Sequence, residues 1–415
     1  MKKRLVYLLL FFVAVLLAFV LQKPCFMLYN EAISRGVSFN DYIQVMWHGV
    51  SLDATTAGYL TAIPWLTVLV SVWFKRFPLR KLLVAYYAII ALVVSIVFIV
   101  DMGLYPFWKF KLDASVFLYL DSPKNAAASV SAWFLIVRTL VILLLSAVST
   151  WALYRITPSV LPAVKKRIAG TGAMILIGGA LFVVIRGGVT ESTANIGQVY
   201  FCNDEFLNHS AVNPAFSLMA SASKTKNYSD EFNYFSEEER ASLFQGLYPT
   251  GDEGTVELLR TKRPNILIVL MESFGGALVE SFGGVKGAST NLDRLSKEGI
   301  WFTNCYANSY RTDRGTVCTF SGYQSFPTLS VMKMPNKSRT LPSIAVELRK
   351  QGYHTDFLYG GDINFTNMKS YLLESITDIS YIYQERESNY DWYVVMMLSL
   401  TAVMTVLVFV VTHFL

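Results

Sequence analysis

The sequence predicts a multi-pass α-helical membrane domain followed by an α/β domain outside the cytoplasm, and this second domain is expected to be incomplete at its C-terminus. Of the 415 residues, 53% are hydrophobic and only 16% are charged, with a mean hydropathy of +0.40. Such a composition places part of the chain in lipid. The apolar residues gather in long runs before residue 186, whereas strand-like and helix-like patterns alternate after residue 264. That alternation is typical of an α/β sheet covered by helices.

Five apolar runs are long enough, or nearly so, to cross a hydrocarbon core of about 30 Å. They cover residues 5–21, 57–74, 82–100, 132–151 and 168–185. A sixth run occupies residues 393–415. We therefore expect a transmembrane domain at 1–186, a juxtamembrane linker with short amphipathic helices at 187–263, the first part of an α/β domain at 264–376, a connector at 377–392 and an additional span-like segment at 393–415.

The distribution of lysine and arginine predicts the orientation of these spans. The N-terminus and the second and fourth connections hold eleven cations: Lys2, Lys3, Arg4, Lys75, Arg76, Arg80, Lys81, Arg155, Lys165, Lys166 and Arg167. The two intervening loops hold five: Lys23, Arg35, Lys109, Lys111 and Lys124. Because cytoplasmic loops are enriched in lysine and arginine, the N-terminus is expected in the cytoplasm of a cell (inner) membrane protein, with everything after Ile185 outside. The net charge of +6 follows largely from this pattern, so no nucleic-acid partner is expected.

The four cysteines form no C-x-x-C pair, which argues against zinc-ribbon and thioredoxin-like sites. Arg138 lies near the outer end of the fourth span. Snorkelling to the interface explains it, and a functional arginine inside the membrane is the alternative.

The α/β pattern begins with a continuous apolar run at 266–271, as in a parallel strand buried on both faces. A helix is expected from Thr290 to Lys297, ended by Gly299, and a second strand at 300–306. Further helices are expected at 315–320 and 338–349, and a strand at 355–359.

Two side chains in this region are candidates for a catalytic site. Glu272 follows the first strand, where ligands bind in open α/β sheets, and its carboxylate suits a divalent metal. An ordinary carboxylate at a strand end explains Glu272 equally well. Thr312 is flanked by Arg311 and Arg314, which could bind a transferring phosphoryl group. If Thr312 begins the following helix, it could cap that helix and also meet an anion there.

These residues together resemble a known family. The motifs are Pro264-Asn-Ile-Leu-Ile-Val-Leu-Met-Glu-Ser273, Thr290-Asn-Leu-Asp-Arg-Leu-Ser-Lys-Glu-Gly-Ile300 and Tyr310-Arg-Thr-Asp-Arg-Gly315. They resemble the sulfatase-like branch of the alkaline phosphatase superfamily. With five spans in front of them, the chain is similar to lipoteichoic acid synthases and related phosphoglycerol or phosphoethanolamine transferases.

The resemblance implies a membrane-anchored, metal-dependent transferase or phosphodiesterase that acts on lipid head groups or cell-envelope glycans. It implies Glu272 as a metal ligand and Thr312 as both metal ligand and nucleophile, with Thr316 as the fallback nucleophile. Manganese, magnesium and zinc all suit such a site, and the partner is a membrane phospholipid or glycolipid. The oligomeric state is not predicted. No Cys/Ser-x-Pro-x-Arg motif, from which sulfatases make formylglycine, is present, so sulfate-ester hydrolysis is disfavoured.

The family completes its site with an Asp-His pair and a further histidine from later strands. After Thr312 the chain offers His354 and His413, and neither follows an aspartate. We therefore expect a truncated catalytic domain, through an interrupted gene, an assembly error or a real variant that lost catalysis. This chain is expected to bind metal weakly and to turn over no substrate. The alternative is a non-catalytic membrane protein of the same fold that binds or senses lipid.

Overall fold

The structure is a computed structural model in which two compact units are distinguished. It describes residues 1–33, 36–114, 116–119, 132–190, 192–222, 234–245, 261–272, 274–309, 311–326, 329–359, 362–375 and 382–383. Unit 1 comprises Met1–Thr225 and Thr319–Gln384, and unit 2 comprises Lys226–Cys318 and Glu385–Leu415. The expected span at 393–415 and the connector at 377–392 lie outside the described residues, except for residues 382 and 383.

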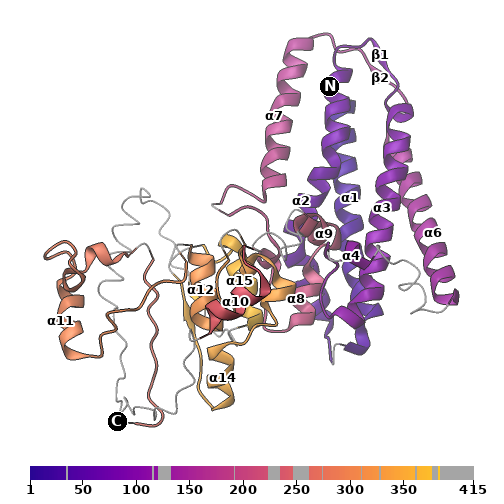
Figure 1. Cartoon of the computed structure of the whole chain (residues 1–415). Helices are drawn as coiled ribbons and strands as arrows, with labels where there is room; N and C mark the ends of the chain where they lie inside the picture. Colours follow the sequence, from indigo (N-terminus) through magenta and orange to yellow (C-terminus); the bar gives the residue numbers. More distant parts are fainter. Residues whose placement is uncertain are drawn as a thin grey trace. The chain divides into compact units, whose positions relative to one another are not determined.

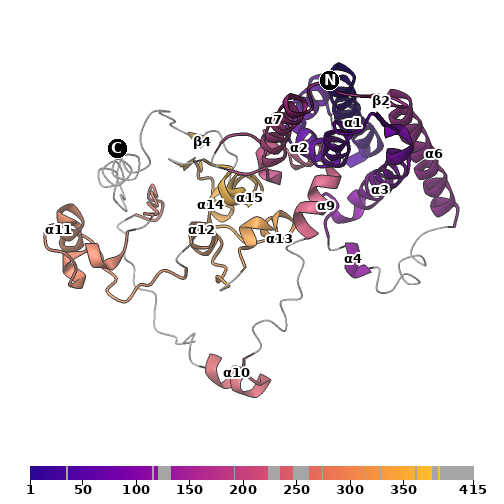
Figure 2. The same cartoon turned by 90° about the horizontal axis from the view of Figure 1, so that it is seen from above.

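Five long helices dominate unit 1. They are α1 (Lys2–Tyr29), α2 (Phe39–Ser71), α3 (Leu79–Trp108), α6 (Ala132–Ile156) and α7 (Arg167–Arg186). Figures 1 and 2 show them side by side, with α2 packed on α1 and α7, and α3 packed on α6. Each of the five expected apolar runs is helical, so this part of the prediction is confirmed.

All five helices are long and apolar enough to cross a membrane. The outward surface of the bundle is also apolar. Leu9, Leu21, Leu140, Leu144 and Leu176 are each more than 60% exposed. Exposed leucines at this density are unfavourable in water but favourable in hydrocarbon, so the surface is compatible with membrane-spanning helices.

The helices extend beyond the expected apolar runs into the first connection. Helix α1 continues through Pro24 to Tyr29, and α2 begins at Phe39 after the short 3-10 helix η1 (Glu31–Ile33). Ser38 and Asp41 form a capping box at the start of α2, in which each side chain bonds the backbone N–H of the other. This local pairing satisfies two otherwise free N–H donors and fixes where the helix begins.

At the N-terminal end of the bundle, an arginine ties three segments together. Arg4 is 1% exposed, and its guanidinium donates to the Ser71 side chain (3.0 Å) and carbonyl (2.9 Å) and to the Pro162 carbonyl (2.9 Å). Beside it, strand β1 (Arg76–Phe77) pairs antiparallel with β2 (Leu161–Pro162). The second and fourth connections therefore meet as a two-stranded ribbon near residue 4.

At the opposite end, two buried ion pairs lie inside unit 1. Lys23 of α1 pairs with Asp53 of α2, and the two side chains are 4% and 0% exposed. Asp53 also accepts a hydrogen bond from the Asn213 side chain at 2.9 Å. A side chain at Gly49 would collide with Lys23, since a Cβ there would lie 2.0 Å from the lysine Cε. Gly49 therefore makes room for the buried lysine.

The second pair joins Lys111 to Asp101 of α3, with side chains 3% and 0% exposed. Asp101 also accepts from the backbone N–H of Leu112 at 2.8 Å, and the Lys111 ammonium lies 3.6 Å from the centre of the Phe26 ring. Burial lowers the pKa of Lys111, and the Asp101 carboxylate opposes that shift. In each pair the opposite charge offsets part of the cost of burying the two groups.

The segment after the fifth helix packs against this end of the bundle. It forms the 3-10 helix η2 (Ile196–Val199), α8 (Glu205–Ala211) and α9 (Pro214–Ala222). Ile196, Val199, Tyr200 and Phe206 share one buried cluster with Phe26, Leu52 and Tyr105 of the long helices. Residues 196–222 therefore belong to the core of unit 1.

A buried polar relay connects this segment to the C-terminal part of the unit. Glu374 Oε1 accepts from the Tyr200 hydroxyl (2.6 Å) and contacts His209 Nε2 (3.0 Å). His209 Nδ1 lies 3.0 Å from the Tyr105 hydroxyl. The tautomer with a proton on Nε2 fits both contacts, because it donates to the carboxylate and its Nδ1 accepts from the tyrosine. Burial raises the pKa of Tyr200 well above its usual range, and Glu374 adds to the shift.

The C-terminal part of unit 1 is built from short elements. They are η5 (Val331–Lys333), α13 (Pro335–Ser338), α14 (Ile344–Lys350), β3 (Phe357–Leu358), η6 (Phe365–Asn367), α15 (Met368–Ser375) and β4 (Ile382–Tyr383). The helix expected at 338–349 was wrong in its extent, since the chain leaves the helix after Ser338 and restarts after Ser343. The strand expected at 355–359 is present only at 357–358, in parallel pairing with β4.

Unit 2 is mostly irregular in the described residues. Its elements are α10 (Glu237–Phe244), η3 (Gly276–Leu278), η4 (Glu280–Phe282), α11 (Thr290–Glu298) and the first part of α12 (Thr312–Ser321). Unit 1 also contains the four-residue helix α4 (Val116–Tyr119). The helix expected from Thr290, ended by Gly299, is confirmed by α11.

The two strands expected in unit 2 were wrong. Residues 266–271 and 300–306 run without strand pairing in the structure. Leu270 is 47% exposed, Phe302 66% and Tyr306 83%. A strand requires a neighbouring strand for its backbone N–H and C=O groups, and none of the described residues pairs with these segments. The sheet of the expected α/β domain is thus represented in the described residues only by the β3–β4 pair.

Candidate functional site

The candidate site is formed within unit 2, at the start of α12. Gly315 N donates to the Arg311 carbonyl at 2.8 Å and so closes the first turn of this helix. Thr312 is the first helical residue, which places its side chain where the free N–H groups of the helix begin. Thr312 was expected to meet an anion only if it began the following helix, and it does begin that helix.

Thr312 and Glu272 lie together although they are 40 residues apart in the sequence. The Thr312 hydroxyl donates a hydrogen bond to Glu272 Oε1. Glu272 is exposed and Thr312 is partly exposed. The carboxylate is held by the end of the extended segment 264–272 rather than by a strand of a sheet. A hydroxyl and a carboxylate are thereby brought together at a solvent-accessible helix start.

The other predicted residues differ in accessibility. Arg311 is exposed and Arg314 is half-buried, both beside Thr312. Thr316, the fallback nucleophile, is 2% exposed and lies one turn further along the helix. A nucleophile must reach its substrate, so the exposure of Thr312 favours it over Thr316.

The turn between Glu272 and α11 is fixed by its own hydrogen bonds. Asp293 accepts from the Ser281 backbone N–H (3.0 Å) and from the Ser289 hydroxyl (3.1 Å). These bonds, that from the Ser281 N–H first, hold the pKa of Asp293 below its usual range. Gly284 bends back closely enough that a Cβ would lie 2.5 Å from the Ala277 carbonyl oxygen. The Thr290-Asn-Leu-Asp293 motif therefore stabilises the local fold of the loop.

Glu272 and Thr312 could supply two oxygen ligands to a divalent cation. Carboxylate and hydroxyl oxygens suit manganese, magnesium and zinc. Among the described residues, no group of three His, Cys, Asp or Glu side chains is placed to hold a metal ion. The donor set therefore fits part of a metal site.

Of the two histidines considered for completing the site, the structure describes only His354. His354 belongs to unit 1, where its Nε2 lies 3.2 Å from Asp356 Oδ1 and its side chain is 70% exposed. His413 lies outside the described residues.

The role of Arg138 was left open. Its guanidinium stacks on the Tyr29 ring at 4.6 Å and donates to the Tyr29 hydroxyl, so its charge has a partner in unit 1.

A basic cavity at the N-terminal end of α7 was not predicted from the sequence. Lys165, Lys166 and Arg167 were considered only as signals of membrane topology, whereas they line this cavity together with Trp73. A tryptophan at the end of one apolar run and three consecutive cations before another are visible in the sequence, but their proximity is not.

Comparison with known proteins gives a partial match. Residues 264–406 match the family model described as Sulfatase. An N-acetylglucosamine-6-O-sulfatase of Bacteroides thetaiotaomicron is 29% identical over 98 residues, which make up 23% of this chain and 17% of that protein. The chain thus spans less than a fifth of that relative's length. No solved structure gives a significant match.

The family match begins where the motif ending at Glu272 begins, and it includes Thr312 and all of α11 and α12. The region that resembles the Sulfatase family thus follows a helical region with several apolar helices.

Proposed function

We propose that this protein is a membrane-anchored, metal-dependent transferase of the phosphoglycerol or phosphoethanolamine type, or a phosphodiesterase, with Thr312 as nucleophile. The observation that carries the proposal is the hydrogen bond from the Thr312 hydroxyl to Glu272 at the start of α12. It lies within the region that matches the sulfatase family. The absence of a Cys/Ser-x-Pro-x-Arg motif favours threonine chemistry on phosphorus over sulfate-ester hydrolysis.

The residues of this chain can divide the reaction as follows. The Thr312 oxygen attacks the phosphorus of a phosphodiester, and a Thr–O–P bond forms as the bond from phosphorus to the leaving alcohol breaks. Glu272 accepts a hydrogen bond from the hydroxyl in the resting state and so orients the attacking lone pair, and the hydroxyl proton ends on the oxygen of the departing alcohol. The positive end of α12 favours the anionic phosphoryl group. Arg311 and Arg314, next to Thr312, add donors for its oxygens.

A divalent cation held by the Glu272 carboxylate and the Thr312 oxygen would lower the pKa of the hydroxyl and neutralise charge on the phosphoryl oxygens. Thr312 would then be the nucleophile as an alkoxide, a stronger nucleophile than the free hydroxyl. Thr316 is buried at 2% exposure and cannot reach a lipid head group without unfolding its helix turn.

The proposed setting is the outer face of a cell membrane. Five apolar helices anchor the chain, and eleven of the cations before residue 186 mark the proposed cytoplasmic side. The part after Ile185 then faces away from the cytoplasm, where a membrane phospholipid or glycolipid supplies the head group. The divisions at 1–186, 187–263 and 264–376 are part of this proposal.

The test is a Thr312→Ala variant of the full chain in membranes. It should lower the manganese-dependent release of the chromophore from a chromogenic phosphodiester by at least about 100-fold. The yield of trapped phosphothreonine should fall by the same factor. Thr312→Ser keeps a hydroxyl and should retain part of both. Thr319→Ala, an exposed threonine on the same helix, is the matched control and should behave as the unaltered chain.

Other outcomes separate the alternatives. Turnover that persists in Thr312→Ala but is lost in Thr316→Ala would transfer the nucleophile role to Thr316. Faster release from a sulfate ester than from the phosphodiester would replace the proposal by sulfatase activity. A chain that binds lipid and turns over neither substrate would be the non-catalytic form of the same fold.

A further inference from the structure

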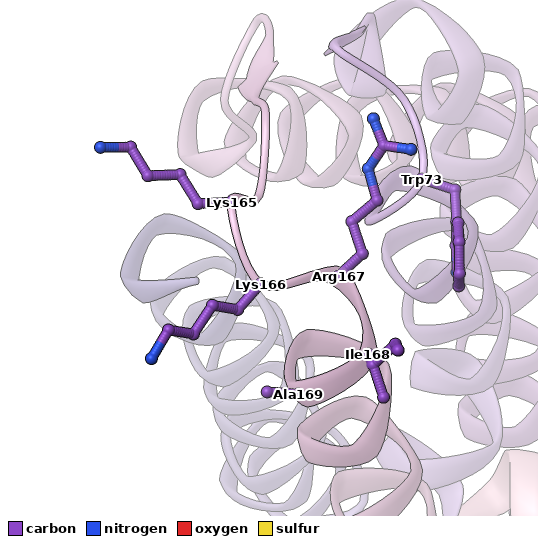
Figure 3. A pocket seen from close by; sticks show the side chains of 6 residues that line it. All are labelled: Trp73, Lys165, Lys166, Arg167, Ile168 and Ala169. Atoms are coloured by element: carbon purple, nitrogen blue, oxygen red, sulfur yellow. The ribbon is translucent and has the colours of Figure 1, made fainter.

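An open cavity of about 640 Å³ lies in unit 1 at the end of the bundle that carries the N-terminus. It is lined by Trp73, just beyond α2, and by Lys165, Lys166, Arg167, Ile168 and Ala169 at the start of α7. Figure 3 shows Arg167 beside the Trp73 ring, while the two lysines extend in the opposite direction. Lysine side chains have flexible four-carbon stems, so their ammonium groups can turn toward an anion without moving the backbone.

This end of the bundle carries positive charge without compensating carboxylates. The sequence has no Asp or Glu from residue 54 to 100 or from 122 to 190. Several cations at this end of the bundle donate hydrogen bonds to other groups of unit 1. Arg4 bonds Ser71 and Pro162, and Arg80 donates to the Thr157 carbonyl at 2.8 Å. Their charge is therefore partly engaged by the protein itself.

The three cations of the cavity are different. In the part of the chain that the structure describes, no hydrogen bond or ion pair engages the side chains of Lys165, Lys166 or Arg167. Helix α7 adds to their field. Its first bond runs from Gly170 N to the Lys166 carbonyl at 2.9 Å, with no side-chain cap. The N–H groups of residues 167–169 thus lack partners within the helix.

The cavity also has an apolar component. Trp73 is 52% exposed and Ile168 is 84% exposed. Tryptophan at the end of an apolar helix is typical of the boundary between lipid and water. A free inorganic anion would use the cations alone, whereas a phosphate attached to hydrocarbon would use both the cations and the apolar surface.

We propose that this cavity binds the phosphate head group of an anionic phospholipid in the leaflet that meets the N-terminus of the chain. The inference rests on the proposed membrane embedding and not on the chemistry of Thr312. Arg167 and the two lysines neutralise the phosphate, the first turn of α7 donates backbone hydrogen bonds, and Trp73 and Ile168 contact the upper part of the acyl chains. The site lies at the end of the bundle opposite the two buried ion pairs, on the side that the proposed topology places in the cytoplasm, whereas the proposed reaction takes place on the outer side.

The test measures lipid binding to the full chain in detergent by native mass spectrometry, with phosphatidylglycerol and phosphatidylcholine titrated separately. The unaltered chain should bind the first phosphatidylglycerol more tightly than phosphatidylcholine. Lys166→Gln/Arg167→Gln should weaken the binding of phosphatidylglycerol roughly 30-fold, at about a factor of five for each cation. Lys3→Gln/Lys81→Gln removes the same charge from exposed residues of the same end and should change binding less than threefold.

Equal losses in the two double variants would overturn the proposal, because they would show attraction to the whole basic surface instead of a site. Displacement of the lipid by inorganic phosphate at equal concentration would also overturn it, since the site would then recognise the anion alone. Repeating the titration in Thr312→Ala separates this inference from the proposed function. Lipid binding at the cavity should be unchanged there whatever happens to phosphodiester turnover.

Discussion

The buried pair of Lys23 and Asp53 offers a direct test of the packing of unit 1. Lys23→Met keeps the length of the side chain and removes its charge, and Asp53→Asn keeps the shape and the contact with Asn213. Because the two side chains are 4% and 0% exposed, water cannot solvate the charge that either single variant leaves behind. Breaking a buried pair in this way costs about 3–5 kcal/mol.

The double variant should be more stable than either single variant, because it leaves no unpaired charge. Replacing both members of a buried pair by uncharged groups is often close to neutral. Arg294 and Glu298 form the matched control. Their side chains are 59% and 56% exposed at a separation of 2.8 Å, and such i,i+4 pairs contribute only about 0.3–0.5 kcal/mol. Arg294→Met should therefore change the free energy of unfolding by well under 1 kcal/mol.

The measurement is reversible unfolding of the full chain in mixed micelles of increasing denaturing detergent, followed by circular dichroism. The sign of the coupling between the two substitutions decides the matter. If the losses of Lys23→Met and Asp53→Asn simply add in the double variant, the two groups are not paired as described. If Lys23→Met costs no more than Arg294→Met, the lysine is solvated and the burial argument fails.

Two further predictions concern unit 1. Glu374→Leu removes the acceptor shared by Tyr200 and His209 and should lower the stability by about 2–3 kcal/mol, whereas Glu374→Gln, which can still accept, should lose less. A thermal shift assay that ranks the two variants equally would contradict the relay. Burial raises the pKa of the Cys202 thiol, so the thiolate forms at higher pH. The contribution of the protonated thiol to stability is therefore lost as the pH rises through the pKa of the folded state. Alkylation followed by mass spectrometry should therefore require a higher pH at Cys202 than at the exposed Cys305, and coincident pH profiles would refute this.

The long helices could be predicted because their apolar runs are longer than any strand. The start of α2 was missed although its signal is local. Ser38 and Asp41 are spaced as a capping box, which can be recognised in a sequence without knowing the fold. The expected span was bounded by its apolar residues at 57–74, so the polar start of α2 was left outside it.

The strands of unit 2 were mispredicted for a different reason. An apolar run of six residues favours a strand only if neighbouring strands are available to pair with it. The periodicity of the run does not indicate whether such strands exist. Residues 266–271 have the composition of a buried strand but no strand pairing in the structure. The confirmed helix α11 needs no distant partner, since its hydrogen bonds are internal.

The proximity of Glu272 and Thr312 was suggested by family resemblance and not by spacing. No periodic pattern relates residues that are 40 positions apart. The buried ion pairs were missed because Lys23 and Lys111 were counted only as loop charges. An aspartate inside an otherwise apolar helix, as at Asp53, calls for a partner, and that partner could have been sought among the nearby lysines.

The contact between Arg4 and the Pro162 carbonyl spans 158 residues of sequence. At a synthesis rate of about 5–20 residues per second, residue 162 is made roughly 8–30 s after residue 4. Before residue 162 is made, all residues of the first three long helices have been synthesised, yet the guanidinium lacks one of its final acceptors. The N-terminal end of the bundle is therefore closed late, when the fourth connection arrives and β2 joins β1. Assembly of this end of the bundle thus includes a step that the first few residues must await.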